Sequence, residues 1–167
     1  DNIRIEKFVE PTTPFDEDFN EIPLYNWAPN NGGIVNLISE AAKLPSAGDG
    51  NGLYVNCVSI YDGVIMTPIH TTIQTGQIYD ISFDIKTLNV PTNAGLYIQS
   101  GNFVFVPIVA DMNERVEVTL TTQAEFIQLF TSVGGLEFTI DNWTIKPHVE
   151  EGISENFEDF NTLNITL

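Results

Sequence analysis

Apolar and polar side chains alternate with a period of two along most of this chain, which is the pattern of half-buried β-strands. The clearest case is residues 77–87, where four apolar side chains from Tyr79 to Ile85 alternate with polar ones. The segments 96–100 and 103–109 flank a Ser-Gly-Asn sequence that is typical of a hairpin turn. Further strands are predicted at residues 53–60, 115–121, 125–131 and 136–145.

One stretch alone resembles a helix, residues 38–44 (ISEAAKL), and Pro45 ends it. The rest of the chain reads as about ten short strands with Gly, Pro and Asn turns between them. This pattern predicts an all-β fold, an antiparallel β-sandwich of jelly-roll type.

Two motifs occur near both ends of the chain. Residues 1–10 (DNIRIEKFVE) match residues 141–150 (DNWTIKPHVE) at five of ten positions, and EDFN stands at both 17–20 and 158–161. Because the offset is about 140 residues each time, we interpret the chain as one period of a tandem array. The expected parts are the last strand of a preceding repeat at 1–10, a linker at 11–14, a complete repeat at 15–148, a second linker at 149–156 and the first strand of the following repeat at 157–167.

Composition narrows the class of protein. The 167 residues carry a formal net charge of −17, which disfavours binding to nucleic acid or to an anionic membrane surface. Hydrophobic residues make up 43% of the chain, enough for a real core. The single cysteine, Cys57, cannot form a disulfide within the chain and is expected to be a buried thiol.

Several segments resemble known families. Residues 71–87, 114–122 and 136–146 resemble the jelly rolls of carbohydrate-binding-module families four and nine, which share a strand after G-x-x-Y and a late strand with an Asp-Asn pair. Residues 15–33 (FDEDFNEIPLYNWAPNNGG) resemble the opening of adhesin-like, choice-of-anchor jelly rolls from secreted Bacteroidetes surface proteins, often arranged in tandem. The resemblance implies a galactose-binding-like or carbohydrate-binding-module-like fold. It also implies that the protein is located outside the cell, on the bacterial cell surface.

The same resemblance implies a structural Ca²⁺ ion held by the first strand, a nearby loop and the last strand. Ca²⁺ binds six to eight oxygen ligands from carboxylates and carbonyls. The alternative interpretation is a solvated acidic strand end beside a simple glycine-rich turn. The matching positions are Asp16, Glu17 and Asp18 in the first strand, Asp49 and Asn51 in the GDGNG loop, and Asp141 in the last strand.

A carbohydrate site would combine aromatic rings, which stack on sugar rings, with amide or carboxylate side chains. Tyr97 and Gln99 share one face of a predicted strand. The alternative is that the tyrosines lie at the rim of the sandwich with their hydroxyls in water. The residues expected to join Tyr97 and Gln99 on a concave sheet are Tyr54, Asn56, Tyr61 and Gln128. Trp143 is expected in the core because it aligns with Ile3 in the repeated motif, and Trp27 is expected to pack there because it lies in the opening motif of the adhesin-like family.

Nothing in the sequence predicts catalytic residues. The two histidines, His70 and His148, lie in loop-like segments, and no G-x-S-x-G motif occurs. Asp80 and Asp84 would lie about 13 Å apart along a strand, beyond the roughly 5–9.5 Å between glycosidase carboxylates.

We therefore expect a non-catalytic extracellular repeat of a long bacterial surface adhesin or filament, acting in adhesion or as a spacer. Its expected partners are neighbouring copies of the same repeat and a glycan or surface polysaccharide. The alternatives are a carbohydrate-binding module of a secreted polysaccharide-degrading enzyme, and a phage fibre or capsid-decoration domain.

Overall fold

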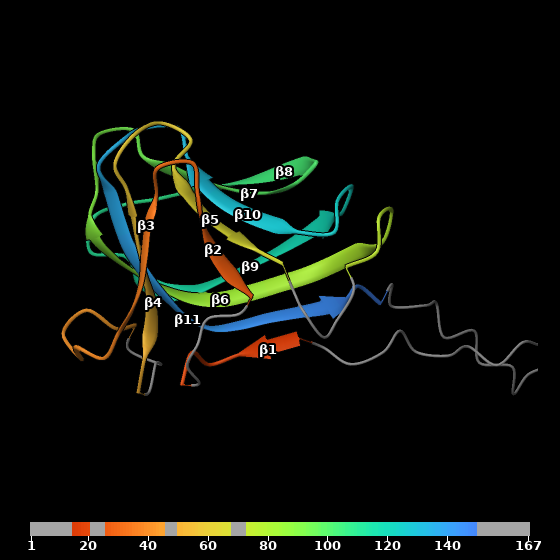
Figure 1. Ribbon diagram of the computed structural model, residues 1–167, viewed down its shortest axis with the longest axis horizontal. Coiled ribbons are helices and arrows are strands. Elements are labelled where there is room, and N and C mark those ends of the chain that lie inside the picture. The colour runs from red at the N-terminus through yellow and green to blue at the C-terminus, as the bar shows by residue number, and fades with distance from the viewer. Residues whose placement is uncertain (1–14, 21–25, 46–49, 68–72, 150–167) are drawn as a thin grey trace, which may run out of the picture.

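The chain forms two antiparallel sheets packed face to face (Figure 1). The computed structural model describes residues 15–20, 26–45, 50–67 and 73–149. Of the predicted parts, the strand at 1–10, the linker at 11–14 and the strand at 157–167 lie outside the described residues, as does the second linker from residue 150 onward.

The larger sheet has six strands, in the order β3-β4-β11-β6-β9, with β1 also paired to β11. Its strands are β1 (Phe15–Glu17), β3 (Ile34–Ile38), β4 (Gly52–Cys57), β6 (Ile78–Asn89), β9 (Asn113–Thr121) and β11 (Leu136–Pro147). The smaller sheet has five strands, in the order β2-β5-β10-β7-β8. Its strands are β2 (Trp27–Asn30), β5 (Gly63–Met66), β7 (Gly95–Ser100), β8 (Asn102–Pro107) and β10 (Ile127–Thr131).

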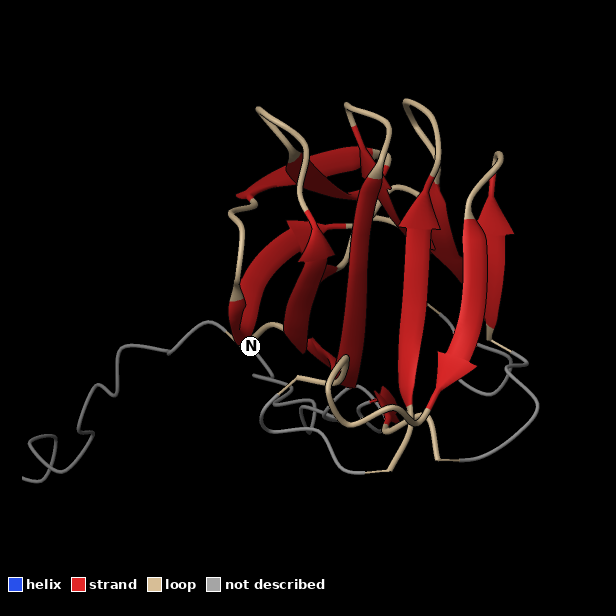
Figure 2. Cartoon of the chain, turned by 90° about the vertical axis from the view of Figure 1, so that its left-hand side faces the viewer, coloured by secondary structure: helices blue, strands red, loops and turns tan. Residues whose placement is uncertain are grey.

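The described residues therefore confirm the all-β, jelly-roll sandwich. They form no helix (Figure 2), and none of them lies in a helix long and apolar enough to cross a membrane. The alternation predicted for 77–87 holds, because Ile81, Phe83 and Ile85 in β6 are fully buried. The hairpin around Ser-Gly-Asn is also present, with Gly101 at its turn in a left-handed conformation.

The helix suggested by residues 38–44 is wrong. Ile38 ends strand β3, and the residues after it form a turn closed by a hydrogen bond from the Lys43 N–H to the Glu40 carbonyl. Leu44 is buried, and a Cβ added at Gly52 would overlap it. This tertiary contact, together with Pro45, outweighs the weak local preference for a helix.

A bulge divides strand β11 into two halves with different partners. The first half, Leu136–Ile140, pairs with β4, whereas Trp143–Ile145 pairs with β1. The register against β6 shifts between Asp141 and Thr144, and Asn142 has a positive φ of 49°. The extra residue lets both Ile140 and Trp143 point into the core.

Four aromatic rings connect the two sheets inside the core. Trp27 of the five-stranded sheet makes an edge contact with Trp143 of the six-stranded sheet, with ring centroids 5.1 Å apart. Phe19 packs on Trp27 at 5.4 Å, and Phe83 stacks on Trp143 at 5.1 Å. The expectation that both tryptophans belong to the core is confirmed.

The outer face of the six-stranded sheet carries charged and polar side chains. On this face the Asp80 carboxylate accepts a hydrogen bond from Thr119 Oγ1 at 2.7 Å and lies 2.9 Å from His148 Nδ1. Burial alone would raise the pKa of Asp80. The hydrogen bonds from Thr119 and His148, with the charge of His148, outweigh burial and lower this pKa below its ordinary value.

A lowered folded-state pKa makes the Asp80 contribution to stability dependent on pH. The contribution is fully present above the unfolded-state pKa of about 3.9 and is lost as the pH falls through the lower folded-state value. We expect Asp80→Asn to lower the free energy of unfolding at about pH 5 and to change it less at about pH 2.5. Urea unfolding of both proteins at the two pH values measures this, and an equal loss at both would contradict the assignment.

Candidate functional site

A cluster of aromatic side chains covers the outer face of the five-stranded sheet. Phe130, Tyr97 and Phe105 are direct neighbours across strands β10, β7 and β8. Each alternates with aliphatic residues that point into the core, so the aromatic rings face outward. Tyr61, in the turn before β5, and Phe103, near the start of β8, extend the cluster at its two sides. These five rings, those of Tyr61, Phe130, Tyr97, Phe103 and Phe105, are called the aromatic face below.

Tyr97 lies at the centre of the aromatic face. Its ring is stacked on Phe130, with centroids 5.2 Å apart and an interplanar angle of 12°. It also contacts Phe105 at 5.1 Å and Phe103 at 5.5 Å, while Tyr61 lies 6.0 Å from Phe130 on the other side. The outermost rings are open to solvent, with Tyr61 56%, Phe103 60% and Phe105 49% exposed.

The position of Phe105 depends on a glycine in the neighbouring strand. Gly95 lies two residues before Tyr97 on the same face of β7, and a Cβ added there would overlap the Phe105 ring. The missing side chain at Gly95 thus leaves the space in which Phe105 lies against the sheet.

Two glutamine side chains lie beside the rings. Gln128 and Gln99 are neighbours across β10 and β7, and Gln128 Nε2 donates a hydrogen bond to Gln99 Oε1 at 2.9 Å. Gln99 Nε2 in turn donates to the Gly101 carbonyl at 3.2 Å. Each amide carries two N–H donors and a carbonyl acceptor, so this pair places both kinds of group next to the aromatic face.

The five-stranded sheet contains no Asp, Glu, Lys, Arg or His within its strands. The strands of the six-stranded sheet hold many such residues, from Asp16 and Glu17 in β1 to Lys146 in β11. The aromatic face is thus carried on uncharged strands in a chain whose formal net charge is −17.

The structure brings four of the predicted sugar-contacting residues together. Tyr61, Tyr97, Gln99 and Gln128 all lie on or beside the aromatic face. Three aromatic members, Phe103, Phe105 and Phe130, were not predicted. Their signal is present in the sequence, because Phe alternates with Val at 103–106 and Phe130 follows Leu129 in a charge-free segment.

Tyr54 and Asn56 do not join the other predicted residues, so the prediction of one common sheet is wrong. Both lie in β4, which belongs to the six-stranded sheet. The Tyr54 hydroxyl donates to Glu137 Oε2 at 2.7 Å. Burial, followed by this hydrogen bond and the negative charge of Glu137, raises the pKa of Tyr54 to about 12.

The described residues among those predicted to bind calcium lie around the bulge in β11, where β1 ends and β4 begins. Asp16 and Asp18 are exposed, Glu17 is half-buried and Asp141 is buried. The loop containing Asn51 reaches the chain after β1, since the Asn51 N–H donates to Asn20 Oδ1 at 3.0 Å. Asp49 lies outside the described residues.

Three of these carboxylates accept hydrogen bonds from nearby backbone groups. Asp18 accepts from the Asn20 N–H, Glu17 from the Phe19 N–H, and Asp141 from the Asn142 N–H. Among the residues that the structure describes, no group of three His, Cys, Asp or Glu side chains is placed to hold a metal ion. Calcium binding therefore stays a prediction.

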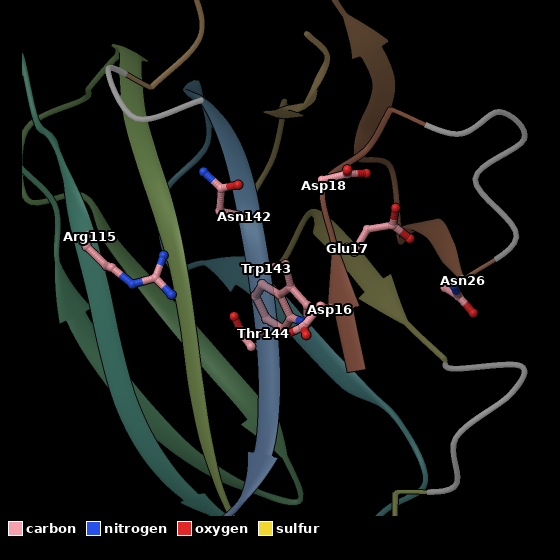
Figure 3. Close-up of a pocket in the computed structure, with 8 residues that line it drawn as sticks. All are labelled: Asp16, Glu17, Asp18, Asn26, Arg115, Asn142, Trp143 and Thr144. Carbon is pink, nitrogen blue, oxygen red and sulfur yellow. The ribbon is translucent and has the colours of Figure 1, made fainter. Parts of the chain in front are cut away.

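The acidic strand β1 borders a pocket of about 530 Å³ on the outer side of the six-stranded sheet (Figure 3). Figure 3 shows Arg115 on the opposite side of the pocket from Glu17 and Asp18. The Arg115 guanidinium lies 3.2 Å from Asp84 Oδ1 and donates to Ser82 Oγ at 2.6 Å. The lining residues are Asp16, Glu17, Asp18, Asn26, Arg115, Asn142, Trp143 and Thr144.

Cys57 is fully buried at the end of β4, as the sequence predicts. Burial, followed by the negative charge of Asp62, raises the pKa of its thiol to about 12. The thiol is therefore kept protonated and unreactive at neutral pH.

No protein-family model and no curated protein sequence matches this chain. Similar solved structures do exist. One is the CBM22-1 xylan-binding domain of Paenibacillus barcinonensis Xyn10C, with a TM-score of 0.54 and 12% identity, covering 80% of this chain and 92% of that one. Another is the CBM22-1–GH10 part of Clostridium thermocellum Xyn10B in complex with xylohexaose. Its TM-score is 0.61 at 15% identity, covering 81% of this chain and 28% of that one.

A third similar structure is the K1 cleaved adhesin domain of Lys-gingipain from Porphyromonas gingivalis. Its TM-score is 0.57 at 13% identity, and the match covers 83% of this chain and all of that domain. Similarity at such low identity shows a shared fold. The chain thus has the β-sandwich fold found in carbohydrate-binding modules and in an adhesin domain.

Calcium can be tested through stability, because an ion that binds only the folded state raises the melting temperature. If the predicted site exists, melting in millimolar Ca²⁺ should occur at a higher temperature than in excess chelator. Asp141→Asn should reduce that difference, whereas Asp111→Asn, in an exposed turn, should leave it intact. Identical melting temperatures with Ca²⁺ and with chelator would contradict the predicted calcium site.

Proposed function

We propose that this chain is a non-catalytic carbohydrate-binding module, and that the aromatic face binds an uncharged polysaccharide. The observation that carries the proposal is the solvent-exposed aromatic face beside the Gln99–Gln128 amide pair, on strands without a charged residue. Ligand sites commonly combine apolar and aromatic surface with a small number of polar groups that fix orientation.

The aromatic face exposes more clustered apolar area than a surface that contacts only water would be expected to expose. Clustered exposed rings leave apolar area in contact with solvent, and contiguous exposed patches of this kind mark binding sites. A sugar ring presents C–H groups to an aromatic ring and hydroxyls at its edge. Rings such as Tyr97 and Phe105 offer the stacking surface, and the neighbouring amides offer partners for hydroxyls.

The distribution of charged residues in the chain favours an uncharged ligand. The strands below the aromatic face supply no Lys or Arg that could pair with the carboxylates of an acidic polysaccharide. The net charge of −17 would also repel such a polymer during approach. A neutral polysaccharide meets neither obstacle.

The structural similarities agree with this proposal. The Paenibacillus domain is named as xylan-binding, and the Clostridium structure holds xylohexaose. Xylan and xylohexaose are therefore suitable first probes, although the shared fold alone does not assign a ligand to this chain.

Tyr97→Ala tests the proposal because it removes the ring that contacts three others. We expect the affinity for xylohexaose, or for another neutral oligosaccharide that the wild type binds, to fall about tenfold or more, equivalent to about 1.4 kcal/mol. Isothermal titration calorimetry measures the loss, and circular dichroism checks that the variant is folded.

Tyr54→Ala is the matched control, since Tyr54 lies on the six-stranded sheet. The affinity of the Tyr54→Ala variant for the same oligosaccharide should equal that of the wild type. Equal losses in both variants, or tight binding of polygalacturonate at low salt, would contradict a neutral-glycan site on the aromatic face.

We also infer that this module is one repeat of a bacterial surface adhesin array. Within the described residues, the recurring segments are 17–20, which begins at the last residue of β1, and 141–149, which includes the second half of β11. Asp141 and Ile145, two of the positions that match in the second segment, are buried. Phe19 within the repeated EDFN motif is fully buried. The recurrence thus includes residues that are buried in this fold, as a repeated domain would require. The gingipain adhesin domain of the same fold supports this inference.

The sequence of the full-length parent protein tests the array. We expect further copies at a period of about 140 residues, each with an aromatic residue at the position of Phe19 and an apolar one at that of Trp143. A single copy joined to a glycoside hydrolase domain would overturn the array and leave the carbohydrate-binding proposal in place.

A further inference from the structure

Tyr61 occupies one end of the aromatic face and is held there by an unusual set of contacts. It lies in the turn between β4 and β5, with its ring 6.0 Å from Phe130. We propose that Asp62 and Asn31 are positioning residues, which hold Tyr61 where it would contact the ligand before the ligand binds. This inference rests on the proposed carbohydrate-binding function.

The backbone of Tyr61 is in a strained conformation. Its φ of 67° lies in the left-handed region, which glycine adopts freely and a tyrosine does not. The side chain is 56% exposed, so it adds little to the core in return for this strain. A strained backbone under an exposed aromatic side chain points to a role in function.

Asp62 links two turns, the one that contains Tyr61 and the one between β2 and β3. Only 4% of Asp62 is exposed, and each carboxylate oxygen accepts one backbone N–H. Oδ2 accepts from Ser59 at 2.7 Å within the same turn, and Oδ1 accepts from Gly32 at 2.9 Å in the turn between β2 and β3. Hydrogen bonds to an ionised carboxylate are among the stronger ones in proteins.

Both backbone polar groups of Tyr61 are also engaged. Its N–H donates to the Thr131 carbonyl at the end of β10, at 2.8 Å. Its carbonyl accepts from Asn31 Nδ2 at 2.7 Å, and Asn31 itself has a positive φ of 54°. The turn that contains Asn31 is pressed against β5, because a Cβ at Gly33 would overlap the Gly63 carbonyl oxygen.

These contacts leave the Tyr61 backbone little freedom to move. The ring is therefore presented next to Phe130 in the free protein, and binding does not have to order it first. Loosening the contacts should weaken binding even though the Tyr61 ring is still present. A change that acts only through Tyr61 should have no effect once that ring is removed.

The test is a double-mutant cycle with xylohexaose, or another neutral oligosaccharide that the wild type binds, as the probe. Asn31→Ala removes the exposed donor to the Tyr61 carbonyl, and we expect it to weaken binding about threefold to tenfold. In a Tyr61→Ala background the same substitution should change affinity by less than about twofold. Asp62→Asn, which places an N–H donor against a backbone N–H, should behave in the same way, with folding checked by circular dichroism.

A probe-free measurement separates this inference from the proposed function. In protein labelled with 3-fluorotyrosine, the ¹⁹F resonance of Tyr61 should shift or broaden in Asn31→Ala, while that of Tyr54 should not change. If no glycan binds, the proposed function fails, and the ¹⁹F spectra still decide whether Asn31 positions Tyr61. Unchanged Tyr61 resonances in both variants, or equal affinity losses with and without the Tyr61 ring, would overturn the positioning role.

Discussion

Charged side chains occupy the strands of only one of the two sheets, and the aromatic face depends on this separation. The six-stranded sheet carries charges such as those of Asp80, Arg115 and Lys146, which keep its outer face hydrated. The five-stranded sheet exposes rings and amides instead. A chain with a net charge of −17 has many acidic residues to distribute, so their absence from these strands reserves one surface for an uncharged partner.

The core fixes this surface in place. Phe19, Trp27, Trp143 and Phe83 pack on one another in that order and hold the sheets together, while the bulge at Asn142 turns Trp143 inward. Behind the aromatic face, aliphatic residues of β10 and β7 are fully buried, so their strands cannot rotate to bury the rings. The face therefore rests on a rigid support, which favours binding without rearrangement.

Local sequence predicts the fold class and part of the site. Period-two alternation gives the strands and the inward residues of β6, and it places Tyr97 and Gln99 on one face because they are two residues apart. It cannot tell that β4 lies in the other sheet, because strand order is set by non-local pairing, and Tyr54 was therefore misplaced. Phe103 and Phe105 lie in a strand that is apolar on both faces, so alternation there does not show which face meets solvent. Phe130 shares the outer face of β10 with Gln128, so alternation does carry a signal for its exposure. The turn residues Asn31 and Asp62 gave no signal, since their role depends on two turns far apart in the sequence.

We propose the aromatic face as the ligand-binding surface of this chain. Backbone amide chemical shifts followed by NMR during titration with a neutral oligosaccharide such as xylohexaose test it most directly. We expect the shifted amides to belong to β5, β7, β8, β10 and the turn around Tyr61. Shifts confined to the outer face of the six-stranded sheet, or no shifts with any neutral oligosaccharide in a panel, would contradict it.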